Sequence, residues 1–237
     1  MTKRVERIGE SVIVYDDELA SQITEAWFEP SHWTDVSAAP DGGRGQTLFV
    51  KCNQQDWVIR HYYRGGMARR VLVDEYIWLG AKRTRSFREW SLLERMISMD
   101  LPVPRPVAAR FVRRGIIYTA DLITVRIPDV TSFARRLADR AVPLDAWRKA
   151  GELVRQFHRA GIYHADLNAH NIQVNKDDEM FLLDFDRGSI RSAPGAWSER
   201  NLERLKRSLG KISNQYDVPF SAQEWNWLLA GYQAKGV

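Results

Sequence analysis

The chain has 237 residues, 44% hydrophobic and 27% charged, enough for one compact domain or two small lobes with a substantial core. Its net charge of +5 favours an anionic partner, such as a nucleotide, a phospholipid surface, an acidic glycolipid or a nucleic acid. The single cysteine, Cys52, excludes an internal disulfide. Residues 1–10 lack the apolar core of a secretory signal. No apolar run approaches the ~18–20 residues that span a bilayer.

The first elements predicted are an edge strand over residues 11–15 and a short helix from Asp17 to about Phe28, ended by Pro30. A glycine-rich stretch then precedes the apolar run 47–50, and its glycines are Gly42, Gly43 and Gly45. Because glycine has no Cβ, a glycine turn between two strands lets backbone N–H groups approach phosphates. Glycine turns are also common without a ligand, so this stretch alone is a weak signal.

Residues 57–63 are typical of a strand that places Val58, Arg60 and Tyr62 on one face. Between Arg60 and Arg88, basic residues are mixed with aromatic and aliphatic ones, which suits an anionic interface such as lipid headgroups. The alternative is a solvated insertion, over about 64–86, whose apolar residues cover the first lobe.

A helix is predicted over residues 87–96, followed by a hairpin over 111–118 and a strand over 121–127. The second half predicts helices over 132–139, 144–160, 197–213 and 222–232, and Gly161 is expected to end the second of these.

Two segments carry the chemistry. Residues 164–171 read His-Ala-Asp-Leu-Asn-Ala-His-Asn, and residues 181–184 form an apolar run that ends at Asp184. Asp166, Asn171 and Asp184 are the residue types that phosphoryl transfer requires, since one acid orients the attacking hydroxyl while a carboxamide and a second acid hold Mg²⁺. His158, His164 and His170 recur every six residues, which is not a zinc-ligand spacing, and we expect His164 to anchor the loop.

The spacing resembles the H-x-D-x(4)-N and D-F-x motifs of the eukaryotic-like protein-kinase superfamily. The resemblance implies an α+β, bilobal protein-kinase-like fold, with an N-terminal lobe of antiparallel sheet plus one helix over 1–127 and a reduced, mainly helical C-terminal lobe over 128–237. It implies ATP and Mg²⁺ as cofactors and Asp166 as the catalytic residue. The nucleotide-binding residues it implies are Gly42, Gly43, Gly45, Val58, Arg60, Glu89 and Val125. Glu89, rather than Glu94, is expected to pair with Arg60, which stands where kinases have lysine, and Asp186 replaces the usual glycine.

Residues 59–66, 164–171 and 183–187 further resemble the bacterial 3-deoxy-D-manno-octulosonic acid (Kdo) kinases. That resemblance implies phosphorylation of the 4-hydroxyl of Kdo on a Kdo-containing lipid A glycolipid, by a peripheral protein on the cytoplasmic face of the inner membrane. An anionic membrane surface is then a partner. The substrate contacts expected are His170, Arg69, Arg70, Lys82 and Arg83.

Two alternatives remain open on the sequence alone. One is a heptose kinase or another small-molecule kinase of the same superfamily, and another is a membrane-associated pseudokinase scaffold, suggested by Arg60 and Asp186. Nucleic-acid binding is not expected because no reader motif accompanies the basic residues. No obligate protein partner is evident.

Overall fold

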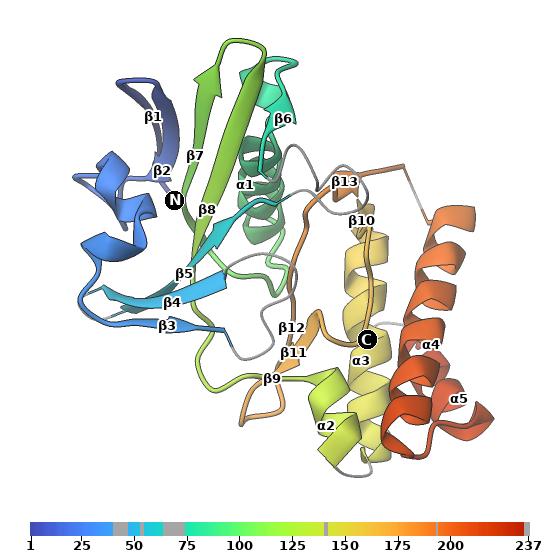
Figure 1. Ribbon diagram of the computed structural model, residues 1–237. Coiled ribbons are helices and arrows are strands. Elements are labelled where there is room, and N and C mark those ends of the chain that lie inside the picture. The colour runs from blue at the N-terminus through green and yellow to red at the C-terminus, as the bar shows by residue number, and fades with distance from the viewer. Residues whose placement is uncertain (40–46, 53–54, 64–73, 140–141, 193, 235–237) are drawn as a thin grey trace. The chain divides into compact units, whose positions relative to one another are not determined.

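The computed structural model describes residues 1–39, 47–52, 55–63, 74–139, 142–192 and 194–234. The chain divides into two compact units (Figure 1). The N-terminal unit comprises Met1–Arg95 with Pro104–Arg126, and the C-terminal unit comprises Met96–Val103 with Ile127–Val237. The short segment 96–103, which the sequence placed in the first lobe, groups with the C-terminal unit.

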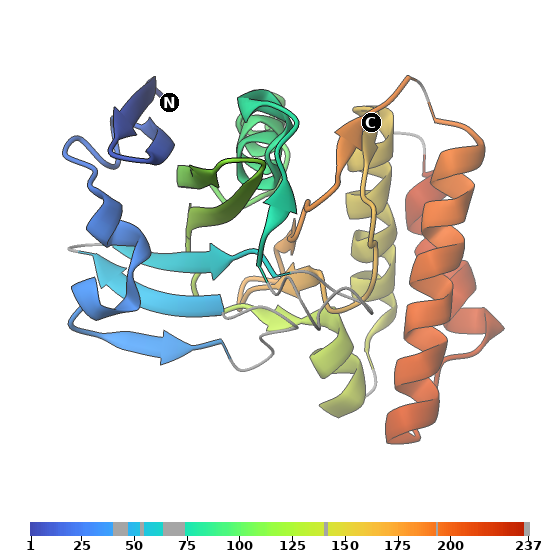
Figure 2. The same cartoon turned by 45° about the horizontal axis from the view of Figure 1, so that its top comes forward.

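An antiparallel sheet forms the N-terminal unit. Its strands, in spatial order, are β1 (Lys3–Ile8), β2 (Ser11–Asp16), β7 (Pro106–Arg114), β8 (Ile117–Val125), β5 (Gln55–His61), β4 (Thr47–Cys52) and β3 (Val36–Ala38). A short strand, β6 (Tyr76–Ile77), pairs with the start of β8. Figure 2 shows β3, β4 and β5 side by side, so two strands flank the glycine-rich stretch 40–46, which lies outside the described residues.

Two predictions for the N-terminal segment are wrong. The strand at residues 11–16 is not an edge strand, because β1 pairs with it along its whole length. The helix expected from Asp17 to Phe28 is replaced by turns and two 3-10 helices, η1 (Glu25–Phe28) and η2 (Pro30–His32). Ala20, Ile23 and Phe28 still become buried, but in the core that the sheet presents, so tertiary packing overrides the local helical pattern.

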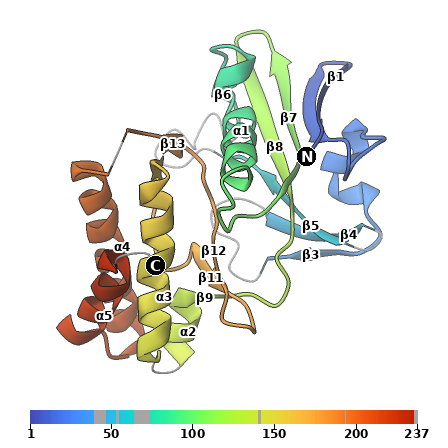
Figure 3. The same ribbon diagram turned by 180° about the vertical axis from the view of Figure 1, so that it is seen from behind.

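The sheet has two differently covered faces because side chains alternate along each strand. Phe111 of β7 points toward α1 (Arg85–Ile97), where its ring centre lies 4.9 Å from that of Phe87. Its neighbour Arg110 points to the other face, toward η1, where it donates a hydrogen bond to the backbone oxygen of Glu25. The helix α1, near the predicted range 87–96, thus covers one face, and Figure 3 shows α1 beside β7 and β8 from behind.

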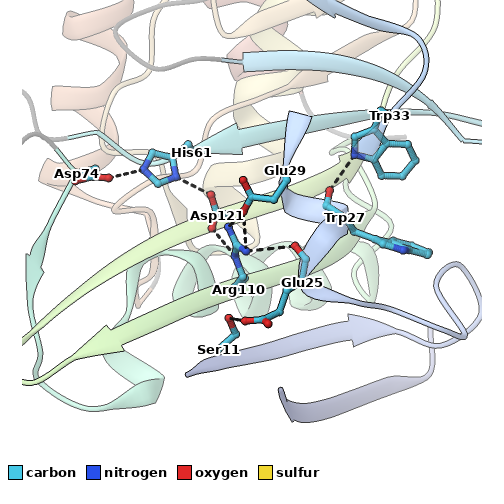
Figure 4. A network of polar contacts seen from close by, with 9 residues as sticks. All are labelled: Ser11, Glu25, Trp27, Glu29, Trp33, His61, Asp74, Arg110 and Asp121. Carbon is cyan, nitrogen blue, oxygen red and sulfur yellow. Dashed lines mark hydrogen bonds and ion pairs between the residues drawn. The ribbon is translucent and has the colours of Figure 1, made fainter. Parts of the chain in front are cut away.

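A chain of charged groups crosses the face that carries Arg110 (Figure 4). Asp121, 2% exposed, accepts from Arg110 Nε at 2.8 Å and contacts His61 Nδ1 at 2.6 Å. The other ring nitrogen of His61 lies 3.2 Å from Asp74. Although burial favours the neutral ring, the two carboxylates raise the pKa of His61 above its ordinary value. Since a neutral imidazole donates only one N–H, the two carboxylates favour the protonated ring.

The C-terminal unit is mainly helical. Its elements are α2 (Phe133–Asp139), α3 (Leu144–Arg159), α4 (Ala196–Tyr216) and α5 (Ala222–Gln233), with the strands β9 (Thr131–Ser132), β10 (Ile162–Tyr163), β11 (Ile172–Val174), β12 (Met180–Leu182) and β13 (Ser189–Ile190). Glycines allow α3 and α5 to approach closely, since a Cβ on Gly151 would lie 2.0 Å from the Leu228 backbone oxygen and one on Gly231 would lie 2.0 Å from that of Arg148. Figure 3 shows α5 against α3.

The four helices of the C-terminal unit were predicted to within about three residues at each end. Gly161 ends α3 with a φ of 72°, as predicted, and the tight approach of Arg191 leaves no room for a Cβ there. None of the described helices combines the length and the apolarity that crossing a bilayer requires.

Candidate active site

A hairpin in the C-terminal unit brings two of the predicted site residues to one end. In β11 and β12, Ile172 pairs with Leu182, so the residues just outside this pair stand opposite each other. The Leu183 N–H accordingly donates to the Asn171 backbone oxygen at 2.9 Å. Asn171 and Asp184 therefore leave the same end of the hairpin.

His164 connects this end of the hairpin to the loop that carries Asp166. Its ring is 2% exposed, Nδ1 accepts the Asp166 backbone N–H at 3.1 Å, and Nε2 lies 2.9 Å from the backbone oxygen of Leu183. One nitrogen accepts and the other donates, which describes a neutral imidazole. Burial lowers the pKa of His164, which keeps the ring in that form. These contacts are those of an anchor, as expected from the sequence.

Asp166 presents a half-exposed carboxylate in the loop before β11. Its Oδ1 lies 3.4 Å from Nη1 of Arg204 on α4, and its Oδ2 accepts from Asn168 Nδ2 at 3.3 Å. Asn168 also accepts the backbone N–H groups of His170 and Asn171, at 2.9 and 3.2 Å, which fixes the turn. The Asn171 side chain donates through Nδ2 to the Asp166 backbone oxygen at 3.0 Å, so its Oδ1 is the atom that could bind a cation.

The position of Asp184 is fixed by the buried ring of the next residue, Phe185. Phe185 is 1% exposed, and its ring centre lies 4.8 Å from that of His164 and 5.6 Å from that of Phe157. Asp184 itself is exposed and has a φ of 63°, a left-handed conformation that side chains other than glycine seldom adopt. Such backbone strain is concentrated at functional sites, where surrounding packing maintains it.

The N-terminal unit contains a second group of predicted residues. Arg60 of β5 forms an ion pair with Glu89 of α1, and the Tyr62 hydroxyl donates to the same carboxylate at 2.6 Å. Glu89 is 4% exposed, and burial together with its charge raises the pKa of Tyr62 well above the ordinary value. The predicted pairing of Arg60 with Glu89 is present, while Glu94 pairs with Lys3 at 3.0 Å.

The other predicted residues fall in three places. Val58 and Val125 are half-buried in β5 and β8, where Val58 pairs with Thr124 and Val125 with Trp57. Lys82 and Arg83 are exposed in a 3-10 helix of the N-terminal unit, η4 (Ala81–Arg83), and His170 is exposed in the C-terminal unit. Five further predicted residues lie outside the described residues: Gly42, Gly43, Gly45, Arg69 and Arg70.

Three residues that shape the loop escaped the sequence analysis. Asn168 and Arg204 contact Asp166 directly, and Asn201 of α4, 1% exposed, donates to the His164 backbone oxygen at 3.0 Å. An asparagine between two motif residues was a signal available in the sequence, since asparagine favours turns. Nothing in the pattern of α4 distinguished Asn201 and Arg204 from ordinary helix residues.

The donor set suits Mg²⁺ better than a transition metal. Among the described residues, no cluster of three or more histidine, cysteine, aspartate or glutamate side chains could enclose a metal ion. Asn171 and Asp184 offer one amide and one carboxylate, hard oxygen ligands of the kind Mg²⁺ takes when phosphates and water complete its shell.

Comparison with known proteins decides the family. Residues 27–232 match the model of the lipopolysaccharide kinase (Kdo/WaaP) family. The chain belongs to this family. Kinase membership makes it a phosphotransferase that acts on a hydroxyl group, which confirms the enzyme class predicted from the motifs.

Relatives of this lipopolysaccharide kinase extend over most of its length. It is 41% identical over 227 residues to a 3-deoxy-D-manno-octulosonic acid kinase of Stenotrophomonas maltophilia, covering 94% of this chain and 90% of the relative. It is 46% identical over 207 residues to a protein of the same name from Xanthomonas oryzae pv. oryzae, covering 86% of this chain and 82% of the relative.

Solved structures confirm the protein-kinase-like α+β fold of this lipopolysaccharide kinase. WaaP in complex with acyl carrier protein gives a TM-score of 0.60 at 18% identity, covering 93% of this chain and 88% of that one. Spectinomycin phosphotransferase in complex with ADP and spectinomycin gives a TM-score of 0.52 at 11% identity, covering 85% and 75%.

Proposed function

We propose that this chain is an ATP-dependent kinase that phosphorylates the 4-hydroxyl of Kdo on a Kdo-lipid A precursor during assembly of the lipopolysaccharide core. The observation that carries the proposal is the loop that holds Asp166 and Asn171 together, with Asp184 at the same end of the adjoining hairpin. Relatives named as Kdo kinases support the choice of acceptor and do not favour a heptose kinase or a pseudokinase.

Asp166 is the proposed catalytic residue. Its half-exposed carboxylate accepts the proton of the sugar hydroxyl as the oxygen–phosphorus bond forms, while the bond to the bridging oxygen breaks and its electrons leave with ADP. The transition state is loose, so positioning and charge stabilisation matter more than a strong base. Arg204 and Asn168, which contact the carboxylate, orient it for this transfer.

Asn171 and Asp184 would hold Mg²⁺, and Mg²⁺ when bound neutralises charge on the nucleotide phosphates. The strained backbone of Asp184 and the buried ring of Phe185 keep that carboxylate directed outward.

The nucleotide-binding roles belong to the N-terminal unit. Arg60 binds phosphate as a permanent cation, and Glu89 fixes its direction. Val58 and Val125 supply apolar contact and backbone for the adenine, and Gly42, Gly43 and Gly45 the phosphate-covering loop. A guanidinium binds phosphate through two N–H groups where the lysine ammonium acts as a point charge.

The acceptor is an acidic glycolipid in a membrane, so the protein is expected to act as a peripheral protein at the cytoplasmic face of the inner membrane. Lys82 and Arg83, both exposed, together with Arg69 and Arg70, would contact lipid phosphates, and His170 would contact the sugar.

The test measures phosphate transfer from ATP to Kdo-lipid A, with the product mapped by mass spectrometry and heptosylated core and lipid-free core sugars as competing acceptors. Asp166→Ala is expected to lower turnover at least ~10²-fold with ATP binding largely kept, while Asp177→Ala, an exposed acid in the β11–β12 turn, leaves turnover near normal. Near-normal turnover in Asp166→Ala would remove that residue from the mechanism. Phosphate found only on heptose would reassign the acceptor.

A further inference from the structure

Exposed aliphatic side chains gather in the N-terminal unit where β6 pairs with the start of β8. Figure 1 shows β6 beside this end of the β7–β8 hairpin. Ile116 in the turn is 81% exposed, Leu79 is 65% exposed and Ile77 of β6 is 63% exposed. Ile77 pairs with Ile117, and the Trp78 N–H donates to the Ile116 backbone oxygen at 2.9 Å, so the three side chains belong to one surface. Lone exposed aliphatic residues are normal on a protein, but three together at a protruding turn require an explanation.

This surface is held rigidly from beneath. Side chains alternate along 76–79, and the inward pair, Tyr76 and Trp78, packs on Tyr118 with ring centres 5.5 and 6.1 Å away. Trp78 also packs on Phe111 at 5.0 Å. Because Tyr76 and Trp78 pack inward, the alternating side chains Ile77 and Leu79 face outward.

Cations lie near the aliphatic residues. Arg113 lies over the Trp78 ring at 4.8 Å and donates to the Gly115 backbone oxygen at 2.9 Å, and Arg114 beside it is exposed. A hollow of about 570 Å³ adjoins the turn, and Trp78, Phe111, Arg7 and Arg113 are among the residues that line it. Ala81 also lines the hollow, which brings the exposed Lys82 and Arg83 to the same end. Glu10 is the acid in this lining.

We infer that this end of the N-terminal unit, defined by Ile77, Leu79 and Ile116 with Arg113 and Arg114, is the surface that docks on an anionic lipid bilayer. Aliphatic side chains enter the boundary between headgroups and acyl chains, while the surrounding guanidinium and ammonium groups bind lipid phosphates. The inference deepens the proposed function, because a kinase whose acceptor is a membrane glycolipid needs a contact of this kind.

The charges favour a bilayer over another partner. A second copy of this chain, docked through the same surface, would bring the same cations face to face. An acidic protein would satisfy the arginines but would leave the aliphatic tip without an apolar environment. A bilayer with anionic headgroups satisfies both.

The test is flotation of the whole protein with vesicles of phosphatidylethanolamine and phosphatidylglycerol, compared with neutral phosphatidylcholine vesicles. Ile116→Ser is expected to lower partition into anionic vesicles about tenfold, and Arg114→Ser about fivefold. Val36→Ser and Lys51→Ser are matched controls on β3 and β4, away from β6 in the sheet order, and leave partition unchanged. Raised salt weakens binding of the control variants and of the unaltered chain alike.

Vesicle binding requires no phosphotransfer, so it fails or succeeds independently of the acceptor assignment. Phosphorylation of detergent-dispersed acceptor by Ile116→Ser stays near normal, whereas its activity on vesicle-embedded acceptor falls. Equal partition of Ile116→Ser, Arg114→Ser and the two controls overturns the inference. The inference is also overturned if Ile116→Ser abolishes a dimer in buffer, or a complex with acidic acyl carrier protein, but leaves vesicle binding unchanged.

Discussion

Replacing Glu89 with glutamine tests the role of the buried carboxylate in the N-terminal unit. The side chain is 4% exposed, and it accepts from Arg60 and from the Tyr62 hydroxyl. Glutamine keeps nearly the same shape and one acceptor oxygen but removes the negative charge. The guanidinium of Arg60 then loses its carboxylate while its side chain stays only 22% exposed.

The loss of unfolding free energy in Glu89→Gln can be estimated from the burial of this ion pair. Removing one partner of a fully buried ion pair costs about 3–5 kcal/mol. The partial exposure of Arg60 lets water recover some of this cost, and the retained acceptor preserves one hydrogen bond. We therefore expect Glu89→Gln to lower the free energy of unfolding by about 2 kcal/mol, and to raise the KM for ATP because Arg60 is no longer held in direction.

Urea unfolding followed by circular dichroism measures the first effect, and initial rates against ATP concentration measure the second. Glu94→Gln is the matched control on the same helix, because Glu94 pairs with Lys3 at a half-exposed site where an ion pair contributes at most about 1 kcal/mol. Equal unfolding free energies for the two variants would refute the reasoning. A double-mutant cycle with Arg60→Met isolates the coupling between the two side chains.

Further predictions concern packing, pH and the catalytic loop. Gly151→Ala, whose new methyl would overlap the backbone of α5, lowers the unfolding free energy by more than about 3 kcal/mol, while Gly210→Ala, in open space on α4, raises it by about 0.5–1 kcal/mol. Burial lowers the pKa of His158 to about 4, so folding favours the neutral ring. The free energy of unfolding is therefore highest above pH 6.5 and falls by about 3 kcal/mol as the pH is lowered to 4. Urea unfolding at a series of pH values measures this dependence, and His158→Gln removes it. The pKa of His61 is raised instead, so the protonated ring stabilises the fold below pH 6.5, and this stabilisation is lost as the pH rises through the pKa of the folded state. In His61→Gln, the free energy of unfolding no longer falls over that pH range. Asn168→Ala lowers kcat with little change in the KM for ATP, and Asn168→Asp, which keeps the oxygen that accepts the two loop N–H groups, restores part of it.

The sequence was most informative where local pattern and tertiary contact agree. The helices α1 to α5 follow apolar periodicity. The pairing of Glu89 with Arg60, which the structure contains, was an expectation from the resemblance to kinases. The loop from His164 to Asn171 was recognisable because chemistry fixes both the residue types and their intervals.

The sequence failed where the deciding partner is remote. The strand β1 is exposed along almost its whole length, so it carries no apolar pattern, and only its pairing with β2 reveals it. The segment 17–28 has helix-like apolar spacing, but its buried residues are drawn into the sheet core. Arg204 and Asn201 reach the loop from α4, more than 30 residues later in the chain, and no local signal marks such contacts.

The geometry of the candidate site depends on one neutral histidine more than on the motif acids themselves. The hairpin fixes Asn171 against Leu183, and a slip of one residue would turn Asp184 to the opposite face. His164 then ties Leu183 to the backbone of Asp166 by donating at one ring nitrogen and accepting at the other. Protonation would remove the accepting nitrogen, so the lowered pKa that burial imposes is a requirement of the arrangement. A histidine at this position is thus explained by hydrogen-bond geometry, without any part in proton transfer.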